Sequence, residues 1–125
     1  MEIGDVFLPS DPRIDSHPRV VISDPEIAPV VLVNFTGAEG EYRDHSCLLE
    51  VGEYPWLTKQ TCISYKDATF VSPAQLELLE SSGMFRKLAP VSDAVLKKIL
   101  EGAELTDELP IKFIRALASQ GLISS

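Results

Sequence analysis

The sequence is poor in cations, and this limits the partners that its surface can bind. It has 11 Lys or Arg against 19 Asp or Glu, so its net charge is −8. Residues 1–72 carry a net charge of −7, and residues 73–125 carry −1. Binding of polyanions over a broad surface depends on clustered cations that displace counterions. The composition therefore excludes a general nucleic-acid surface and leaves room for a small local basic site.

Long apolar runs and cysteines are also scarce. No apolar stretch approaches the roughly 20 residues that a membrane-spanning helix requires. The first residues lack the basic and apolar segments of a signal peptide. We therefore expect a cytoplasmic protein with no membrane partner. The two cysteines, Cys47 and Cys62, are too few for a disulfide framework and are expected to be small buried side chains.

What the sequence does contain is a β-rich first part, followed by a helical second part. Its 125 residues, 45% of them hydrophobic, suit one domain with a core of its own. Short β-branched runs separated by Pro, Gly and Asp predict about six strands within residues 1–72. Several short strands in so short a length favour a small barrel or a strongly bent sheet. The predicted strands are residues 5–8, 19–23, 30–36, 47–51, 62–65 and 68–71.

Residues 73–125 predict three helices, so the fold class is α+β within a single domain of residues 1–125. Ser72 can cap the first helix, because Pro73 follows at the first helical position and Gln75 completes a capping box. Ser92 can cap the second helix, in which apolar residues recur at helical spacing. Asp107 is the expected cap of the third.

Three segments of the β-rich part carry a resemblance to a known family. The chain opens with a Gly-Asp strand, continues with a proline that precedes an apolar strand, and then has a second apolar strand ending in threonine. This order resembles the PemK/MazF family of toxin–antitoxin ribonucleases over about residues 3–71. These three segments are Gly4-Asp5-Val6-Phe7, His17-Pro18 with Val20-Val21-Ile22-Ser23, and Val30–Thr36. Later in the chain, a divergent branch of the family is resembled by Cys47–Gly52, Tyr54-Pro55-Trp56-Leu57, Ser64-Tyr65 and Ala68.

The resemblance implies an SH3-like β-barrel followed by C-terminal helices, and a homodimer that an antitoxin protein binds. It also implies cleavage of single-stranded RNA without a metal or any other cofactor. In that reaction the ribose 2′-hydroxyl attacks the adjacent phosphate. Such a site needs a base for the hydroxyl, a cation for the charge on phosphorus and an acid for the leaving oxygen.

The resemblance assigns the catalytic residues to the ends of two neighbouring strands. The family normally has arginine before the strand-opening proline, and this chain has His17 there, with Arg19 two residues later. Residues i and i+2 of a strand share a face, so His17 and Arg19 can point the same way. An imidazole can serve as acid or base, and a guanidinium can clamp a phosphate. Thr36 occupies the family's threonine position. The candidate substrate-binding residues are Lys59, Ser64 and Lys66.

Other interpretations of the same residues remain open. Trp56, in an aromatic turn, is expected to plug one end of the barrel, whereas an exposed Trp56 would mark a binding surface. His45, Cys47 and Cys62 lack the spacing of a zinc site, so no metal is expected. The main alternative to a nuclease is a non-catalytic interaction module on the same barrel fold. A DNA reader formed by the last two helices is a third possibility.

Overall fold

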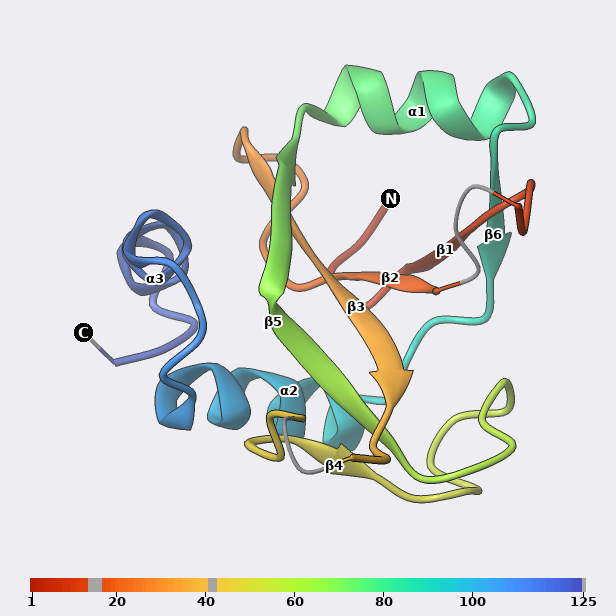
Figure 1. Cartoon of the computed structure of the whole chain (residues 1–125). Coiled ribbons are helices and arrows are strands. Elements are labelled where there is room, and N and C mark those ends of the chain that lie inside the picture. Colours follow the sequence, from red (N-terminus) through yellow and green to blue (C-terminus); the bar gives the residue numbers. More distant parts are fainter. Residues whose placement is uncertain (14–16, 41–42, 125) are drawn as a thin grey trace.

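The computed structural model describes residues 1–13, 17–40 and 43–124, and within them the chain forms six strands and three helices. This confirms the α+β class. The three helices all follow the fifth strand, as Figure 1 shows. In chain order the elements are β1 (Val6–Pro9), β2 (Arg19–Val21), β3 (Val30–Gly37), β4 (Leu48–Leu49), β5 (Thr61–Val71), α1 (Pro73–Ser81), β6 (Phe85–Leu88), α2 (Asp93–Leu105) and α3 (Ile111–Ser119).

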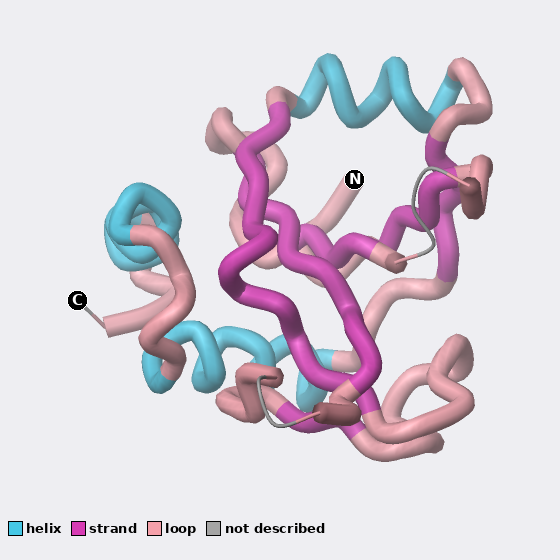
Figure 2. Tube along the Cα trace, viewed as in Figure 1, coloured by secondary structure: helices cyan, strands magenta, loops and turns pink. Residues whose placement is uncertain are grey.

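All six strands belong to one antiparallel sheet in the order β4-β5-β3-β2-β1-β6. The sheet has β4 at one edge and β6 at the other, so it is not closed into a barrel, which was the first of the two predicted forms. The register between β3 and β5 shifts between Leu32 and Asn34, where β5 carries extra residues. Such a bulge bends the strand that contains it, and the bend in β5 is visible in Figure 2. The bend curves the sheet without closing it.

The two faces of the sheet are covered by different helices. Residues opposite each other on antiparallel strands share a face, and Val6, Val20 and Val33 form such a row across β1, β2 and β3. All three are fully buried in the main core, to which α2 and α3 contribute Val95, Ile99, Phe113 and Leu117. On the opposite face, Leu76 of α1 packs in a second core cluster with Phe7, Val21, Val30, Leu32 and Val71.

The part of the chain expected to be purely helical contributes the edge strand β6, which the sequence analysis missed. After α1 the chain turns at Gly83, whose φ of 81° favours glycine, and residues 85–88 pair with β1. Phe85 packs against Phe7, with ring centroids 6.4 Å apart. The strand thus exists because β1 has a free edge and an aromatic partner for it. The strands predicted at 62–65 and 68–71 are both within the single strand β5.

Two of the three predicted helix caps are confirmed. The side-chain oxygen of Ser72 accepts a hydrogen bond from the backbone N–H of Gln75, and that of Ser92 accepts one from the N–H of Val95. The Asp107 cap is wrong, because α2 extends to Leu105 and α3 begins only after Pro110, whose φ of −58° suits entry into a helix. Within the described residues, no helix is long and apolar enough to cross a membrane.

A polar cluster joins the loop before β4 to the turn between α2 and α3. One carboxylate oxygen of Asp44 accepts hydrogen bonds from the backbone N–H and the hydroxyl of Ser46, at 2.9 and 2.6 Å. The hydroxyl of the buried Thr106 donates to the other oxygen. Partial burial by itself raises the pKa of Asp44, but these hydrogen bonds and the nearby His45 together hold that pKa below its usual value.

We expect this cluster to make stability depend on pH in the acid range. Because the pKa of Asp44 is lowered by folding, its contribution is present above the unfolded-state pKa of about 4 and is lost as pH falls through the folded pKa. The free energy of unfolding, measured by urea titration from pH 7 to pH 2.5, should therefore differ most between wild type and Asp44→Asn at neutral pH. The two proteins should converge in acid. A difference that is constant with pH would contradict this role.

Candidate active site

The candidate site lies on the face of the sheet that α1 covers only in part. Arg19 of β2 lies opposite Asn34 of β3, which lies opposite Ser64 of β5, so these three side chains form one row across the sheet. Thr36 lies two residues beyond Asn34 and shares that face. Beside this row the apolar part of the face packs on α1. The row of Arg19, Asn34 and Ser64 therefore continues, with polar side chains, the apolar part of the face that α1 covers.

A pocket of about 210 Å³ at the end of β2 and β3 holds His17 and Thr36 together, as the sequence predicts. The exposed His17 reaches it because the carbonyl of Pro18 accepts a hydrogen bond from Phe35 N–H at 3.0 Å, which continues the β2–β3 pairing. Lys59, from the loop before β5, also lines the pocket. An ideal Cβ at Gly37 would lie only 3.1 Å from Lys59 Nζ, so the absence of a side chain there lets the ammonium lie close over the end of β3.

Arg19 lines a different hollow from His17 and Thr36. This hollow is about 510 Å³ in volume and is also lined by Asp11, Met84 and Phe85. The half-buried Arg19 guanidinium lies over the Phe85 ring, with Cζ 5.6 Å from the ring centroid, which is a cation–π distance. The structure therefore brings an imidazole, a hydroxyl and an ammonium into one pocket, and it holds the guanidinium of Arg19 in another.

The two remaining predicted residues, Ser64 and Lys66, lie on the other side of Thr36. Both line a shallow depression that also includes Thr36 and Arg43. Ser64 is 6% exposed, and its hydroxyl donates a hydrogen bond to Asp67 at 2.5 Å, whereas Lys66 is exposed. Thr36 thus borders both hollows, and Lys66 offers a second cation on the far side of it.

Trp56 does not plug the end of a barrel, and that prediction is wrong. Its side chain is 42% exposed and lines the pocket of His17 and Thr36. The neighbouring Tyr54 is the buried aromatic instead, with a hydroxyl that donates to the carbonyl of Ala89 and a pKa that burial raises to about 12. The two rings of the aromatic turn therefore have different roles. Tyr54 fixes the turn to the body of the protein, and Trp56 stands at the surface.

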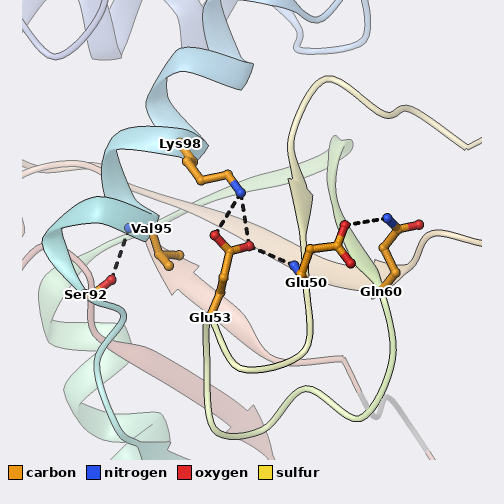
Figure 3. Close-up of polar contacts among 6 residues, drawn as sticks. All are labelled: Glu50, Glu53, Gln60, Ser92, Val95 and Lys98. Atoms are coloured by element: carbon orange, nitrogen blue, oxygen red, sulfur yellow. Dashed lines mark hydrogen bonds and ion pairs between the residues drawn. The ribbon is translucent and has the colours of Figure 1, made fainter.

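The loop that carries Trp56 and Lys59 is held by a polar network at both ends, which Figure 3 shows. The carboxylate of Glu53 accepts two hydrogen bonds from Lys98 Nζ of α2, at 2.9 and 3.0 Å, and one from Glu50 N–H at 2.7 Å. Gln60 Nε2 donates to Glu50 Oε1 at 2.6 Å. The Glu50 N–H and the Lys98 ammonium hold the pKa of Glu53 below its usual range.

The groups in the pocket suit proton transfer and stabilisation of an anion. An imidazole is the side chain best able to exchange a proton near neutral pH, a lysine ammonium compensates developing negative charge, and a threonine hydroxyl donates a hydrogen bond. Thiol chemistry is disfavoured, because burial raises the pKa of Cys47 to about 11 and also raises that of Cys62. Across residues 1–13, 17–40 and 43–124, no three His, Cys, Asp or Glu side chains are grouped so that they could hold a metal ion.

An exposed Trp56 was the alternative interpretation of the aromatic turn, and Lys59 was a predicted substrate-binding residue, but nothing in the sequence predicted that both would line the pocket of His17. Comparisons with known proteins add no assignment to this geometry. No protein-family model matches the chain, and no curated protein matches it.

Proposed function

We propose that the protein is an endoribonuclease that cleaves single-stranded RNA without a metal, in the manner of the PemK/MazF toxins. One observation carries the proposal. His17, Thr36 and Lys59 line a single pocket of about 210 Å³, and the indole of Trp56 is exposed beside them. These groups supply the acid–base, hydrogen-bonding and cationic functions that transfer of a phosphoryl group to a neighbouring hydroxyl requires.

The proposed reaction uses the ribose 2′-hydroxyl as the nucleophile. His17 removes the proton as the 2′-oxygen bonds to phosphorus, and the bond from phosphorus to the 5′-oxygen of the next nucleotide breaks. The same imidazole then returns the proton to the leaving 5′-oxygen. Lys59 compensates the charge that develops on the non-bridging oxygens, and the Thr36 hydroxyl donates a hydrogen bond to one of them. The products are a 2′,3′-cyclic phosphate and a free 5′-hydroxyl.

Arg19, Ser64 and Lys66 have supporting roles in this proposal. Ser64 and Lys66 line a depression that shares Thr36 with the pocket, so we assign them to a nucleotide that flanks the cleaved bond. Arg19 lines a hollow that shares no described residue with the pocket, so we assign it to a nucleotide farther along the strand. The bent antiparallel sheet supports an SH3-like arrangement that is open between β4 and β6. The homodimer and the antitoxin partner belong to the same proposal, because they follow from the resemblance to this toxin family.

The test is a cleavage assay with purified wild-type protein and 5′-labelled single-stranded RNAs of varied sequence, in the presence of EDTA. We expect cleavage that leaves a 2′,3′-cyclic phosphate. A substrate with a single 2′-deoxyribose at the cleaved position should resist cleavage there, because it lacks the attacking hydroxyl. Intact RNA across all sequences, at protein concentrations up to the micromolar range, would overturn the proposal.

A non-catalytic interaction module is the second candidate, and the junction of α2 and α3 favours it. Leu105 at the end of α2 is 73% exposed and Ile111 at the start of α3 is 62% exposed. A contiguous exposed apolar patch marks a surface that binds another chain, and in this second proposal Leu105 and Ile111 belong to such a patch. This function predicts no RNA cleavage, and loss of partner binding in Leu105→Ser together with Ile111→Ser.

A further inference from the structure

The indole of Trp56 is a wall shared by two hollows. The first is the pocket of His17, Thr36 and Lys59. The second, of about 330 Å³, is lined by Pro9, Pro12 and Arg86 together with Trp56. Because Trp56 contributes to both, a chain-like ligand that leaves the first hollow can enter the second by crossing the indole.

Each hollow presents one exposed cation. The Lys59 side chain is 59% exposed, and its Nζ lies 3.8 Å from the carboxylate of Glu39, which is itself 83% exposed. Arg86, in the second hollow, is also exposed. In a protein with a net charge of −8, an aromatic face with a cation in the hollow on each side is a local exception to the general acidity. It fits a ligand that repeats an anion on both sides of a flat ring.

Contacts of the neighbouring residues fix the position of the loop that carries the Trp56 indole. Tyr54 is buried two residues before it, and the ion pair between Glu53 and Lys98 joins the same loop to α2. Pro55 restricts the backbone at the position between Tyr54 and Trp56. A preorganised aromatic face loses little conformational entropy when a ring stacks on it. Anchoring of this kind suits a stacking surface better than an adaptable protein contact.

We propose that Trp56 is a stacking platform for the base of the nucleotide next to the cleaved bond, and that Arg86 binds the phosphate beyond that base. The inference rests on the proposed function, since it continues the same RNA strand out of the His17 pocket. Stacking on an aromatic side chain tolerates any base, because every base has a π face. The second hollow therefore increases the affinity for RNA and sets the direction in which the strand leaves the His17 pocket, with little discrimination among bases.

Trp56 is the only tryptophan in the chain, so its fluorescence reports on this surface alone. The probe is a single-stranded RNA of eight nucleotides with 2′-fluoro groups, which cannot be cleaved because the attacking hydroxyl is absent. We expect the probe to quench the emission of wild-type protein. We measure the affinity by fluorescence anisotropy of a labelled probe. The affinity of Trp56→Ala should be at least about tenfold lower than that of wild type, and the affinity of Trp56→Phe should lie between the two.

The role of Arg86 has its own measurement and a matched control. Arg86→Ala should weaken binding and reduce the slope of log K against log salt by about 0.7, the value for one phosphate contact on a single strand. Lys97→Ala is the control, because Lys97 is an exposed cation on α2, with 78% of its side chain accessible and Glu101 as its ion-pair partner. This control should bind the probe as wild type does, and circular dichroism should show unchanged folding in all four variants.

The outcomes separate this inference from the proposed nuclease activity. If the protein cleaves RNA but Trp56→Ala binds the probe with wild-type affinity, the stacking platform is overturned and the nuclease stands. If the probe quenches Trp56 and its binding depends on Arg86 but RNA is never cleaved, Trp56 and Arg86 remain a binding surface for single-stranded RNA and the nuclease is overturned. Emission that changes with protein concentration alone would assign the face to a second protein chain and overturn the platform.

Discussion

Replacement of His17 by alanine should lower the rate of metal-free RNA cleavage by about 100-fold or more. General acid–base catalysis contributes factors of this size, and His17 is the only imidazole in the pocket that also holds Thr36 and Lys59. The substitution should leave the fold intact, because His17 is exposed and precedes the first residue of β2. The measurement is the initial rate of formation of the 2′,3′-cyclic phosphate product from a saturating concentration of RNA.

The second histidine provides a matched control for this prediction. His45 is also exposed, and its Nε2 lies 2.9 Å from the carbonyl oxygen of Ala38, outside the pocket of His17. His45→Ala should therefore cleave RNA at close to the wild-type rate. Free imidazole added to His17→Ala should restore part of the activity, which a purely structural role would not allow. Equal rates for wild type and His17→Ala would remove His17 from the mechanism.

Replacement of Gly102 by alanine should destabilise the protein by about 2 kcal/mol and lower its melting temperature by roughly 5–10 °C. A Cβ at this position in α2 would lie 2.3 Å from the Tyr65 hydroxyl oxygen, 2.7 Å from Cys47 Cβ and 3.0 Å from the Ser46 carbonyl oxygen. Alanine favours a helix by up to about 1 kcal/mol over glycine, and overpacking that costs 1–3 kcal/mol or more opposes this gain.

The atom that blocks alanine most closely is fixed in place. Tyr65 is fully buried, and its hydroxyl donates a hydrogen bond to the carbonyl of Ile99 at 2.6 Å. Tyr65→Phe removes that oxygen, so the double variant with Gly102→Ala should lose less stability than the two single variants predict in sum. Urea unfolding of the four proteins completes the cycle. A Gly102→Ala variant as stable as wild type would show that α2 shifts away from β5 at little cost.

The elements that sequence patterns predicted best are those that local residues determine. β3 coincides with its predicted run within one residue, because an unbroken apolar stretch suits a strand buried on both faces. Ser72 and Ser92 cap their helices through residues only three positions away. By contrast, β6 exists through its pairing with β1, about 80 residues earlier. No local pattern in Phe85–Leu88 encodes that partner. Because β6 pairs with the outer edge of β1, that edge does not pair with β4 at the other end of the sheet, and the sheet stays open.

The same distinction holds in the candidate site. The proximity of His17 and Thr36 was predictable, because neighbouring strands place their adjacent ends together. The positions of Trp56 and Lys59 depend on a loop that Glu53 ties to Lys98, 45 residues away in sequence. Arg19 was expected on the face that it occupies, but the aromatic ring of Phe85, from the unpredicted β6, draws its guanidinium into another hollow.

The pairing of β1 with β6 also bears on how the chain acquires its structure during synthesis. β1 is made before the other five strands of this sheet, yet its outer neighbour is residues 85–88. At ordinary rates of translation this segment emerges several seconds later. Until then β1 has an unsatisfied edge and Phe7 lacks its aromatic neighbour, so the nascent chain is exposed to wrong partners during that interval. Residues 1–72 alone therefore leave the outer edge of β1 unpaired, and the sheet is complete only once residues 85–88 have been made.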